Sequence, residues 1–246
     1  MKSTWKRNTI GAAALIFLIG LVGTIATGFQ YFTYDFTSSD KQVAVEKAEV
    51  VDLDINFAKG IFHLSGGANQ LMEGKFQYTE NFDPPKIKYR ENGSKGSLSL
   101  SQGKPTNWFT WFAEENNEWK IRLQNDLPIH LNIETGVGIN QFQLGDLNLQ
   151  SLNLEAGVGD TELDLREDWQ NSFDANIKVG VGEFRILLPE ETGVRVKVDH
   201  GVGNVSAVGL EKLGGYYQNS AYETATEKID ITIELGVGEL ELIVGK

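Results

Sequence analysis

The chain contains 246 residues, of which 22 are basic and 34 acidic, and it has no cysteine. A net charge of −12 repels nucleic-acid phosphates, so the composition indicates no nucleic-acid partner. Without cysteine the chain can form neither a disulfide framework nor a thiolate zinc site. The hydrophobic content of 41% is ordinary for a folded protein that buries a core.

Segment 1–34 is predicted to be a cytoplasmic basic flank followed by a transmembrane signal anchor. Residues 10–29 carry no charge, and a helix of this length spans roughly 30 Å, the thickness of the hydrocarbon layer. Lys2, Lys6 and Arg7 precede this run, and every acidic residue follows it. By the positive-inside rule we expect a single-pass protein of the cell membrane with an extracytoplasmic C-terminal domain. The alternative is a cleaved signal peptide.

The strongest pattern in the chain is the tripeptide Gly-Val-Gly, which occurs five times. Apolar residues alternate on both sides of it, as in LNLEAGVGDTELDL, and a period of two indicates β-strands. Successive first glycines are separated by 21, 23, 21 and 35 residues, which suits one solenoid rung per copy. Residues without Cβ permit close backbone approach or a bend, so we expect these glycines to be structural. They are Gly136, Gly138, Gly157, Gly159, Gly180, Gly182, Gly201, Gly203, Gly236 and Gly238.

The repeats occupy residues 128–246, which are predicted to form a β-solenoid region, and residues 35–127 are predicted to form an N-terminal β region with an aromatic loop. Residues 51–65 alternate in the same way, with Ala58-Lys59-Gly60 in place of Gly-Val-Gly, and are predicted to be a degenerate first unit. Further strands are predicted at 75–78, 86–90, 97–101 and 119–123. The predicted fold is therefore all-β, with a stacked β-solenoid-like domain preceded by one N-terminal transmembrane helix.

Four aromatic residues gather in the segment WFTWF, whose composition differs from that of the alternating strands. They are candidates for binding a ligand or partner, because exposed aromatic rings stack on sugars or enter the membrane interface. The alternative is a loop that caps the end of the β core. These residues are Trp108, Phe109, Trp111 and Phe112. A weaker group of the same kind is Tyr216, Tyr217 and Tyr222.

A charged residue stands two positions before the first glycine of each repeat. In a stacked fold these side chains would form a ladder along one face. They are Glu134, Glu155, Lys178, Asp199 and Glu234. One interpretation is a solvated face in which the lysine relieves repulsion between neighbouring rungs. The other is a surface for cations or polycations, joined by Asp160 and Glu183 from the next aligned position.

Motifs for catalysis, cofactors or metals are not found in the sequence. His63, His130 and His200 lie in separate units, and none has the spacing of a metal site. The chain has no Gly-x-Ser-x-Gly motif, no thiol nucleophile and no Walker loop. We therefore expect no enzyme activity, no catalytic residues, no cofactor and no metal.

Several segments together resemble the bacterial toast-rack family and the related cell-wall-active antibiotic response proteins. They are LDINFAKGIFHLSGGANQLMEGKFQY, Pro85-Lys86-Ile87, the serial Gly-Val-Gly units and LLPEETGVRVKVDHGVGNV. The similarity extends from about Val51 to Val244. It implies a stacked β architecture at or outside the cell membrane, linked in some members to envelope-stress signalling, and it implies no catalytic residues.

The expected function is a membrane-anchored binding or regulatory module of the cell envelope, linked to the envelope-stress response. Its expected partners are the membrane, through the N-terminal helix, and an envelope protein or cell-wall component. Two alternatives stay open at this point. One is a β-helix enzyme acting on envelope polysaccharide, which would need two converging carboxylates. The other is a passive structural or adhesive solenoid.

Overall fold

The computed structural model describes residues 36–79, 82–103 and 117–245. Within these residues the regular structure is entirely β, as predicted. The strands are β1 (Phe36–Val43), β2 (Val50–Ser65), β3 (Met72–Thr79), β4 (Lys86–Asn92), β5 (Lys95–Ser101), β6 (Glu118–Leu123), β7 (Ile129–Gln143), β8 (Leu149–Asp164), β9 (Phe173–Leu188), β10 (Gly193–Val208), β11 (Glu211–Leu213), β12 (Tyr216–Gln218) and β13 (Lys228–Val244). The transmembrane helix predicted at 10–29 lies outside the described residues, among which no helix has the length and apolarity needed to cross a membrane.

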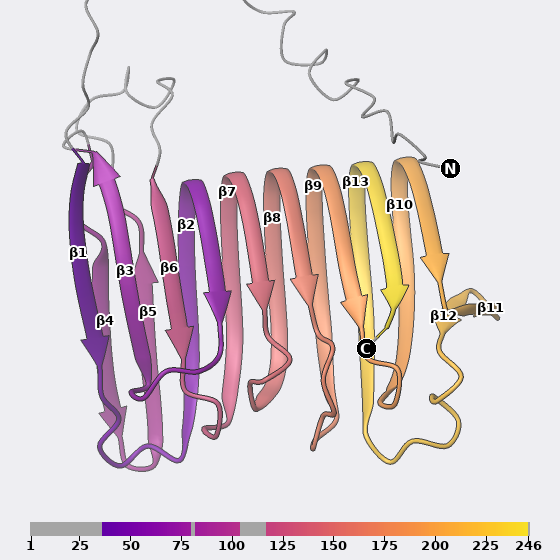
Figure 1. Ribbon diagram of the computed structural model, residues 1–246, viewed down its shortest axis with the longest axis horizontal. Helices are drawn as coiled ribbons and strands as arrows, with labels where there is room; N and C mark the ends of the chain where they lie inside the picture. Colours follow the sequence, from indigo (N-terminus) through magenta and orange to yellow (C-terminus); the bar gives the residue numbers. More distant parts are fainter. Residues whose placement is uncertain (1–35, 80–81, 104–116, 246) are drawn as a thin grey trace, which may run out of the picture. The chain divides into compact units, whose positions relative to one another are not determined.

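The strands β2, β7, β8, β9, β10 and β13 are long, and each turns over in the middle (Figure 1). We call the residues before the turn the first arm and those after it the second arm. In β8 these are residues 149–156 and 160–164, with Gly-Val-Gly between them. The first arms form one layer and the second arms form another.

The long strands stack in parallel with their turns in register. Gly159 lies opposite Gly138, and Gly238 lies opposite Gly182. On the other side of β7, Gly60 of β2 pairs with Gly138, and Lys59 pairs with Val137. The degenerate first unit predicted at 51–65 is therefore confirmed. The four shorter strands predicted before the repeats are confirmed as parts of β3, β4, β5 and β6.

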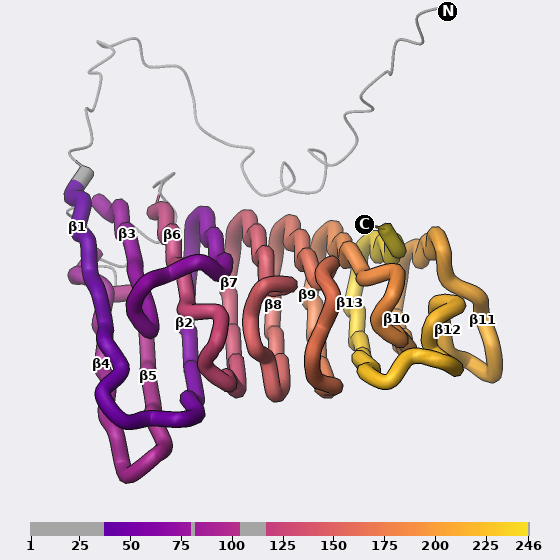
Figure 2. Tube along the Cα trace, turned by 60° about the horizontal axis from the view of Figure 1, so that its bottom comes forward, coloured from indigo at the N-terminus to yellow at the C-terminus, as the bar shows by residue number. Residues whose placement is uncertain are grey.

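The order of the stack differs from the order of the sequence. The long strands follow one another as β2, β7, β8, β9, β13 and β10, so that the C-terminal strand lies between β9 and β10 (Figure 2). Residues 209–227 connect β10 to β13 and carry the short strands β11 and β12. This insertion gives the chain enough length to leave β10, form a hairpin and return on the inner side of β10.

At the β2 end of the stack, one rung is divided into two strands. β5 pairs with residues 50–56 of β2, and β6 pairs with residues 61–65. The two strands therefore take the places of a first and a second arm. β4 then pairs with β5, and β3 and β1 continue the other layer beyond β6.

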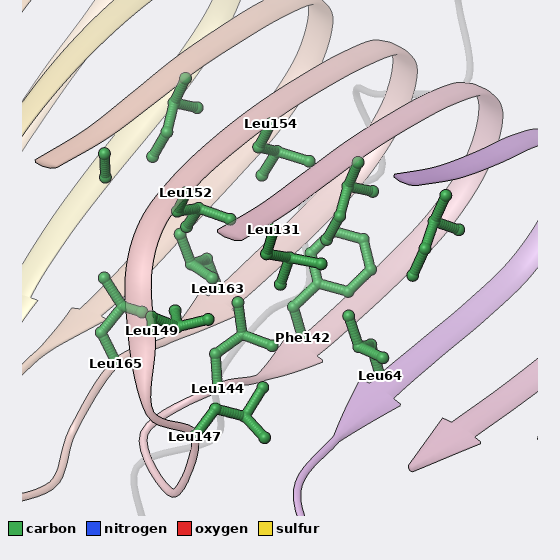
Figure 3. Close-up of a cluster of buried hydrophobic side chains, with 14 of the residues drawn as sticks. Leu64, Leu131, Phe142, Leu144, Leu147, Leu149, Leu152, Leu154, Leu163 and Leu165 are labelled. Carbon is green, nitrogen blue, oxygen red and sulfur yellow. The ribbon is translucent and has the colours of Figure 1, made fainter. Parts of the chain in front are cut away.

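The hydrophobic core lies between the two layers (Figure 3). Leu131 and Leu154 come from first arms, Phe142 and Leu163 come from second arms, and all four are at most 1% exposed. Each fully buried side chain of this size contributes about 1.5–3 kcal/mol to folding. Alternation along each arm sends every second residue into this core, and the remaining residues face outward.

The turns are close-packed because each one touches the backbone of the previous rung. A Cβ on Gly180 would lie 2.4 Å from the carbonyl oxygen of Gly157, and a Cβ on Gly182 would lie 1.8 Å from that of Gly159. Gly182 also has a φ of 146°, which residues with a Cβ rarely adopt. Any side chain at these positions would force neighbouring rungs apart.

We predict that Gly180→Ala and Gly182→Ala each lower the free energy of unfolding by about 1–3 kcal/mol, because the new Cβ collides with a carbonyl oxygen that cannot move alone. Gly245→Ala is the matched control, since no atom lies within 4 Å of its Cβ position. Thermal unfolding checks the three variants. Equal melting temperatures for all of them would contradict the close-packing of the turns.

Candidate binding groove

The outward-facing residues of the first arms form straight columns, because the parallel strands are in register. One column, which we call the asparagine column, consists of Asp54, Asn132, Asn153, Asn176, Thr232 and Lys197. The next, which we call the acidic column, consists of Asn56, Glu134, Glu155, Lys178, Glu234 and Asp199. The charged ladder predicted from the sequence is thus a single column of the folded protein.

Side-chain hydrogen bonds run along the asparagine column from rung to rung. The Nδ2 of Asn132 donates to Oδ1 of Asp54 at 3.0 Å. Asn153 donates to Asn132 at 2.8 Å, and Asn176 donates to Asn153 at 3.2 Å. Each asparagine amide uses one of its two N–H groups in this row of hydrogen bonds, so the second is available to solvent or a ligand.

The acidic column carries its charges in an order that the sequence does not suggest. Because β13 lies between β9 and β10, Glu234 is the neighbour of Lys178, and Asp199 is at the end of the column. The Nζ of Lys178 is 3.6 Å from Glu155, within ion-pair distance. Glu134 accepts a hydrogen bond of 2.8 Å from Nδ2 of Asn56. One lysine therefore stands between two pairs of carboxylates.

Apart from Lys197 and Asp199 at the β10 end, the two columns line a groove with a volume of about 730 Å³, together with Ser99 and Ser101 of β5. A second hollow of about 560 Å³ continues toward the turns and shares Glu134, Glu155, Lys178 and Glu234 with the groove. The acidic column therefore runs along both depressions. Its carboxylates are exposed, so they can meet a ligand from solvent.

A row of exposed valines borders the second hollow at the turns. These side chains, which we call the valine ridge, stand between the glycines of each unit. They are Val137, Val158, Val181, Val237 and Val202, with exposures of 44, 43, 46, 47 and 70%. The prediction from the sequence gave the tripeptides a structural role only and did not include this ridge. The signal was available, because the middle residue is valine in all five copies.

Asp160 and Glu183, which the sequence analysis added to the ladder as part of a cation surface, lie outside the groove. They are on the outer face of the second arms, where they line a separate hollow of about 180 Å³. The guanidinium of Arg185 lies in the same hollow, 2.7 Å from Glu241 and 3.5 Å from Glu162. The turn separates these carboxylates from the acidic column because it sends the second arm to the opposite layer.

The tyrosines of the insertion pack against the end of the stack. Tyr222 is 8% exposed, and its hydroxyl donates to Asp230 at 3.1 Å. Burial and the charge of Asp230 raise the pKa of Tyr222. The guanidinium of Arg195 lies over the rings of Tyr216 and Tyr222, 5.1 and 4.8 Å from their centres. Tyr222 is therefore part of a structural cap, whereas Tyr216 keeps an exposed fraction of 37%.

The aromatic group Trp108, Phe109, Trp111 and Phe112 lies outside the described residues, so its role in binding stays a prediction. Gln102 and Asn117, which precede and follow this segment in the sequence, close the turn of β2. The side chain of Gln102 accepts hydrogen bonds from the backbone N–H groups of Ala58 and Lys59 at 2.7 and 2.8 Å. The carbonyl of Asn117 accepts one from Ile61 at 2.8 Å.

The histidines do not converge. His63 is 3.4 Å from Glu118, and Nδ1 of His130 is 2.9 Å from Oγ of Ser151, whereas His200 is exposed at the turn of β10. Among the described residues, no three His, Asp or Glu side chains are arranged to hold a metal ion.

Glu91 is a carboxylate with a shifted pKa. The hydrogen bond from Tyr89 and the N–H of Glu46 lower the pKa of Glu91, a direction opposite to that needed in a general acid.

The family model described as the N-terminal domain of toast_rack, DUF2154, matches residues 32–187. The crystal structure of a proposed cell adhesion protein from Clostridium sporogenes aligns with a TM-score of 0.79 and 33% identity, over 86% of this chain and 100% of that chain. A proposed adhesin from Bacteroides fragilis aligns over 84% of this chain and 97% of its own, with a TM-score of only 0.30 and 14% identity. A search of the curated proteins gives no match.

We predict that Asn153→Ala lowers the free energy of unfolding by about 1 kcal/mol, because it removes two hydrogen bonds from the middle of the asparagine column. Thr232→Val in the same column is the control, since the hydroxyl of Thr232 makes no hydrogen bond within the described part of the chain. Chemical denaturation of both variants measures the difference. A loss as large for Thr232→Val as for Asn153→Ala would show that the column adds no specific stability.

Proposed function

We propose that this chain, which belongs to the toast-rack family, is an extracytoplasmic binding module of the bacterial cell envelope that is anchored in the membrane by residues 10–29. Its groove on the first arms would bind an extended, cationic ligand such as a lysine-rich segment of an envelope protein. The observation that carries this proposal is the acidic column, which lies along the groove. The similarity to a proposed cell adhesion protein supports a binding role.

The charge of the groove selects for cations. Glu134 and Glu155 are neighbours in the column, as are Glu234 and Asp199, and only Lys178 provides a positive charge within it. Neighbouring parallel strands are about 4.8 Å apart, so carboxylates on adjacent rungs repel one another. A bound ammonium or guanidinium group between two such carboxylates would relieve this repulsion and form charge-assisted hydrogen bonds.

The groove also offers hydrogen bonds that suit an extended chain. The free N–H groups of the asparagine column lie beside the carboxylates and can donate to the carbonyl oxygens of a peptide. Six rungs at about 4.8 Å span about 24 Å, which matches roughly seven residues of an extended ligand. The valine ridge borders this path and can contact the apolar stems of lysine side chains.

Other parts of the expected function remain predictions of the sequence. These are the link to the envelope-stress response, the absence of enzyme activity and the contribution of the aromatic group at 108–112. A passive adhesive scaffold is the alternative to the proposed binding module. It would need no selective groove, so a binding experiment distinguishes the two.

We predict that the chain binds a fluorescent oligolysine peptide and that Glu134→Gln combined with Glu234→Gln weakens this binding about fivefold, since an exposed charge pair contributes roughly 0.2–1 kcal/mol. The protein is used at full length in nanodiscs of neutral lipid, so that the membrane does not attract the peptide. Fluorescence anisotropy measures the dissociation constant at low and at high salt.

The matched control for this experiment is Glu183→Gln combined with Glu239→Gln, which removes the same charge from the outer face of the second arms. The control should bind oligolysine as the parent does. Equal weakening in both double variants would indicate attraction to the net charge of the domain rather than to the groove. No binding by the parent would favour the passive scaffold.

The anchor generates a separate prediction. Protease added to intact protoplasts should digest the C-terminal domain, because the basic flank keeps the N-terminus in the cytoplasm. Detection of a tag at the carboxyl end by immunoblotting checks this result. A tag that stays protected until the protoplasts are lysed would contradict the proposed topology, whatever the result of the peptide-binding experiment.

A further inference from the structure

The stack ends in an open strand edge at β10. Residues 193–208 of β10 pair with β13 on one side, whereas on the other side β12 pairs only with residues 195–197. Within the described part of the chain, no strand and no backbone hydrogen bond covers the outer edge of residues 198–208. Figure 1 shows this second arm at the end of the row, beside the β11–β12 hairpin. Free backbone donors and acceptors along such an edge can pair with another strand.

The second arm of β10 lacks the charges that protect the other edges. Strands that pair on one side only usually carry charged residues, which oppose pairing with other molecules. The three other edge strands follow this rule: β1 has Asp40 and Lys41, β4 has Lys86, Lys88, Arg90 and Glu91, and β11 has Glu211 and Lys212. By contrast, residues 201–208 of β10 (GVGNVSAV) contain no charged residue, and Asp199 is the one Asp, Glu, Lys or Arg along residues 198–208.

The open edge also leaves apolar surface in contact with solvent. Val202 is 70% exposed and Val208 is 60% exposed, compared with 47% for Val237, which neighbours Val202 in the valine ridge. Val205 lies at the end of the core and is only half-buried, although its partner Leu240 is 1% exposed. The last rung therefore packs against β13 on one side, and on the other side its apolar side chains face solvent.

The sequence of this edge is nearly symmetric about Val205. Read from Val202 to Val208, it is Val-Gly-Asn-Val-Ser-Ala-Val, in which valines stand at both ends and in the middle, and a small and a polar residue stand between them. An antiparallel pair of two second arms centred on Val205 would place Asn204 opposite Ser206, whereas Val202 and Gly203 belong to the turn and lie outside this pair. Both copies would then present the same residues, as a two-fold symmetric interface requires.

We propose that two copies of this chain associate through the second arms of β10, which pair antiparallel about Val205. A two-fold axis through this residue joins the second-arm layers of the two copies into one sheet. The uncharged edge is suited to a second copy, because each copy has a net charge of −12 and would be repelled elsewhere. A head-to-tail stack would instead pair this edge with β1 or β4, the outermost strands at the other end, which are charged.

The absence of cysteine allows a crosslinking test of the register in the full-length protein in detergent. Val205→Cys should form a disulfide-linked dimer under mild oxidation, since opposed Cα atoms in an antiparallel pair are about 4.5–5.5 Å apart. Ala207→Cys is the control on the same strand. In the proposed dimer, position 207 of one copy lies at the level of position 203 of the other. The two introduced thiols would therefore be four residues, about 14 Å, apart and should not crosslink.

A charge exchange tests the pairing without a crosslink. Asn204→Asp combined with Ser206→Asp should weaken the dimer at least about tenfold, because like charges would then face each other across the interface. Asn204→Asp combined with Ser206→Lys should restore it, because each new carboxylate would face a new ammonium group. Light scattering of the detergent complex measures the mass, and circular dichroism checks that both variants remain folded.

The proposal is overturned if folded Val205→Cys protein stays monomeric on oxidation, or if Ala207→Cys crosslinks as well as Val205→Cys. It is also overturned if the two charge variants behave alike. A crosslink from Val205→Cys to a different envelope protein, with no homodimer, would assign the edge to another partner. None of these outcomes depends on oligolysine binding, so failure of the groove proposal leaves this test unaffected.

Discussion

The fold depends on the contact between a glycine and the carbonyl oxygen of the neighbouring rung. At Gly182 a Cβ would lie 1.8 Å from that oxygen, and the same contact recurs at Gly238 and Gly203 with distances of 1.8 and 1.7 Å. Because the missing Cβ always faces the same neighbour, each turn can stack in one register only. Hydrophobic burial stabilises the arms, but it would tolerate a shift by two residues, whereas the turns do not.

This fixed register also produces the candidate binding surface. When every rung is aligned at its turn, the residue two positions before the first glycine always falls in the same column. The chain can therefore build a row of like side chains from residues that are 21 or more positions apart in sequence. The hydrogen bonds between Asn132, Asn153 and Asn176 have the same origin. A groove of this kind has a regular spacing, and a ligand with repeated groups fits it better than a compact one.

The sequence predicted those features that depend on local pattern. Alternation predicted the arms, the tripeptides predicted the turns, and the spacing of Glu134 and Glu155 predicted a ladder. The position of β13 could not be predicted, because apolar arms of similar composition fit beside either β9 or β10, and only tertiary packing of the insertion decides between them. That choice makes Glu234 the neighbour of Lys178. The location of Asp160 on the other layer has a different cause, the reversal of direction at the turn of β8, which an alignment of letters does not contain.

The two ends of the stack are closed by different means, and this difference explains the distribution of charge along the edges. At the β2 end, one rung consists of the two separate strands β5 and β6, and the side chain of Gln102 accepts a hydrogen bond from the turn of β2. The outermost strands there, β1 and β4, are charged. At the β10 end the hairpin covers residues 195–197, and Asn219 holds it there by accepting from the N–H of Val194 at 2.9 Å and donating to the carbonyl of Thr192 at 2.7 Å. The same hairpin could have extended along the second arm, but it ends at the first. The hairpin thus covers part of the first arm of β10, and the second arm is left both open and uncharged. These are the properties of a surface that pairs with another strand. If two copies meet there, their grooves become part of one assembly, and a repetitive cationic ligand could engage both at once with a higher effective affinity than a single groove provides.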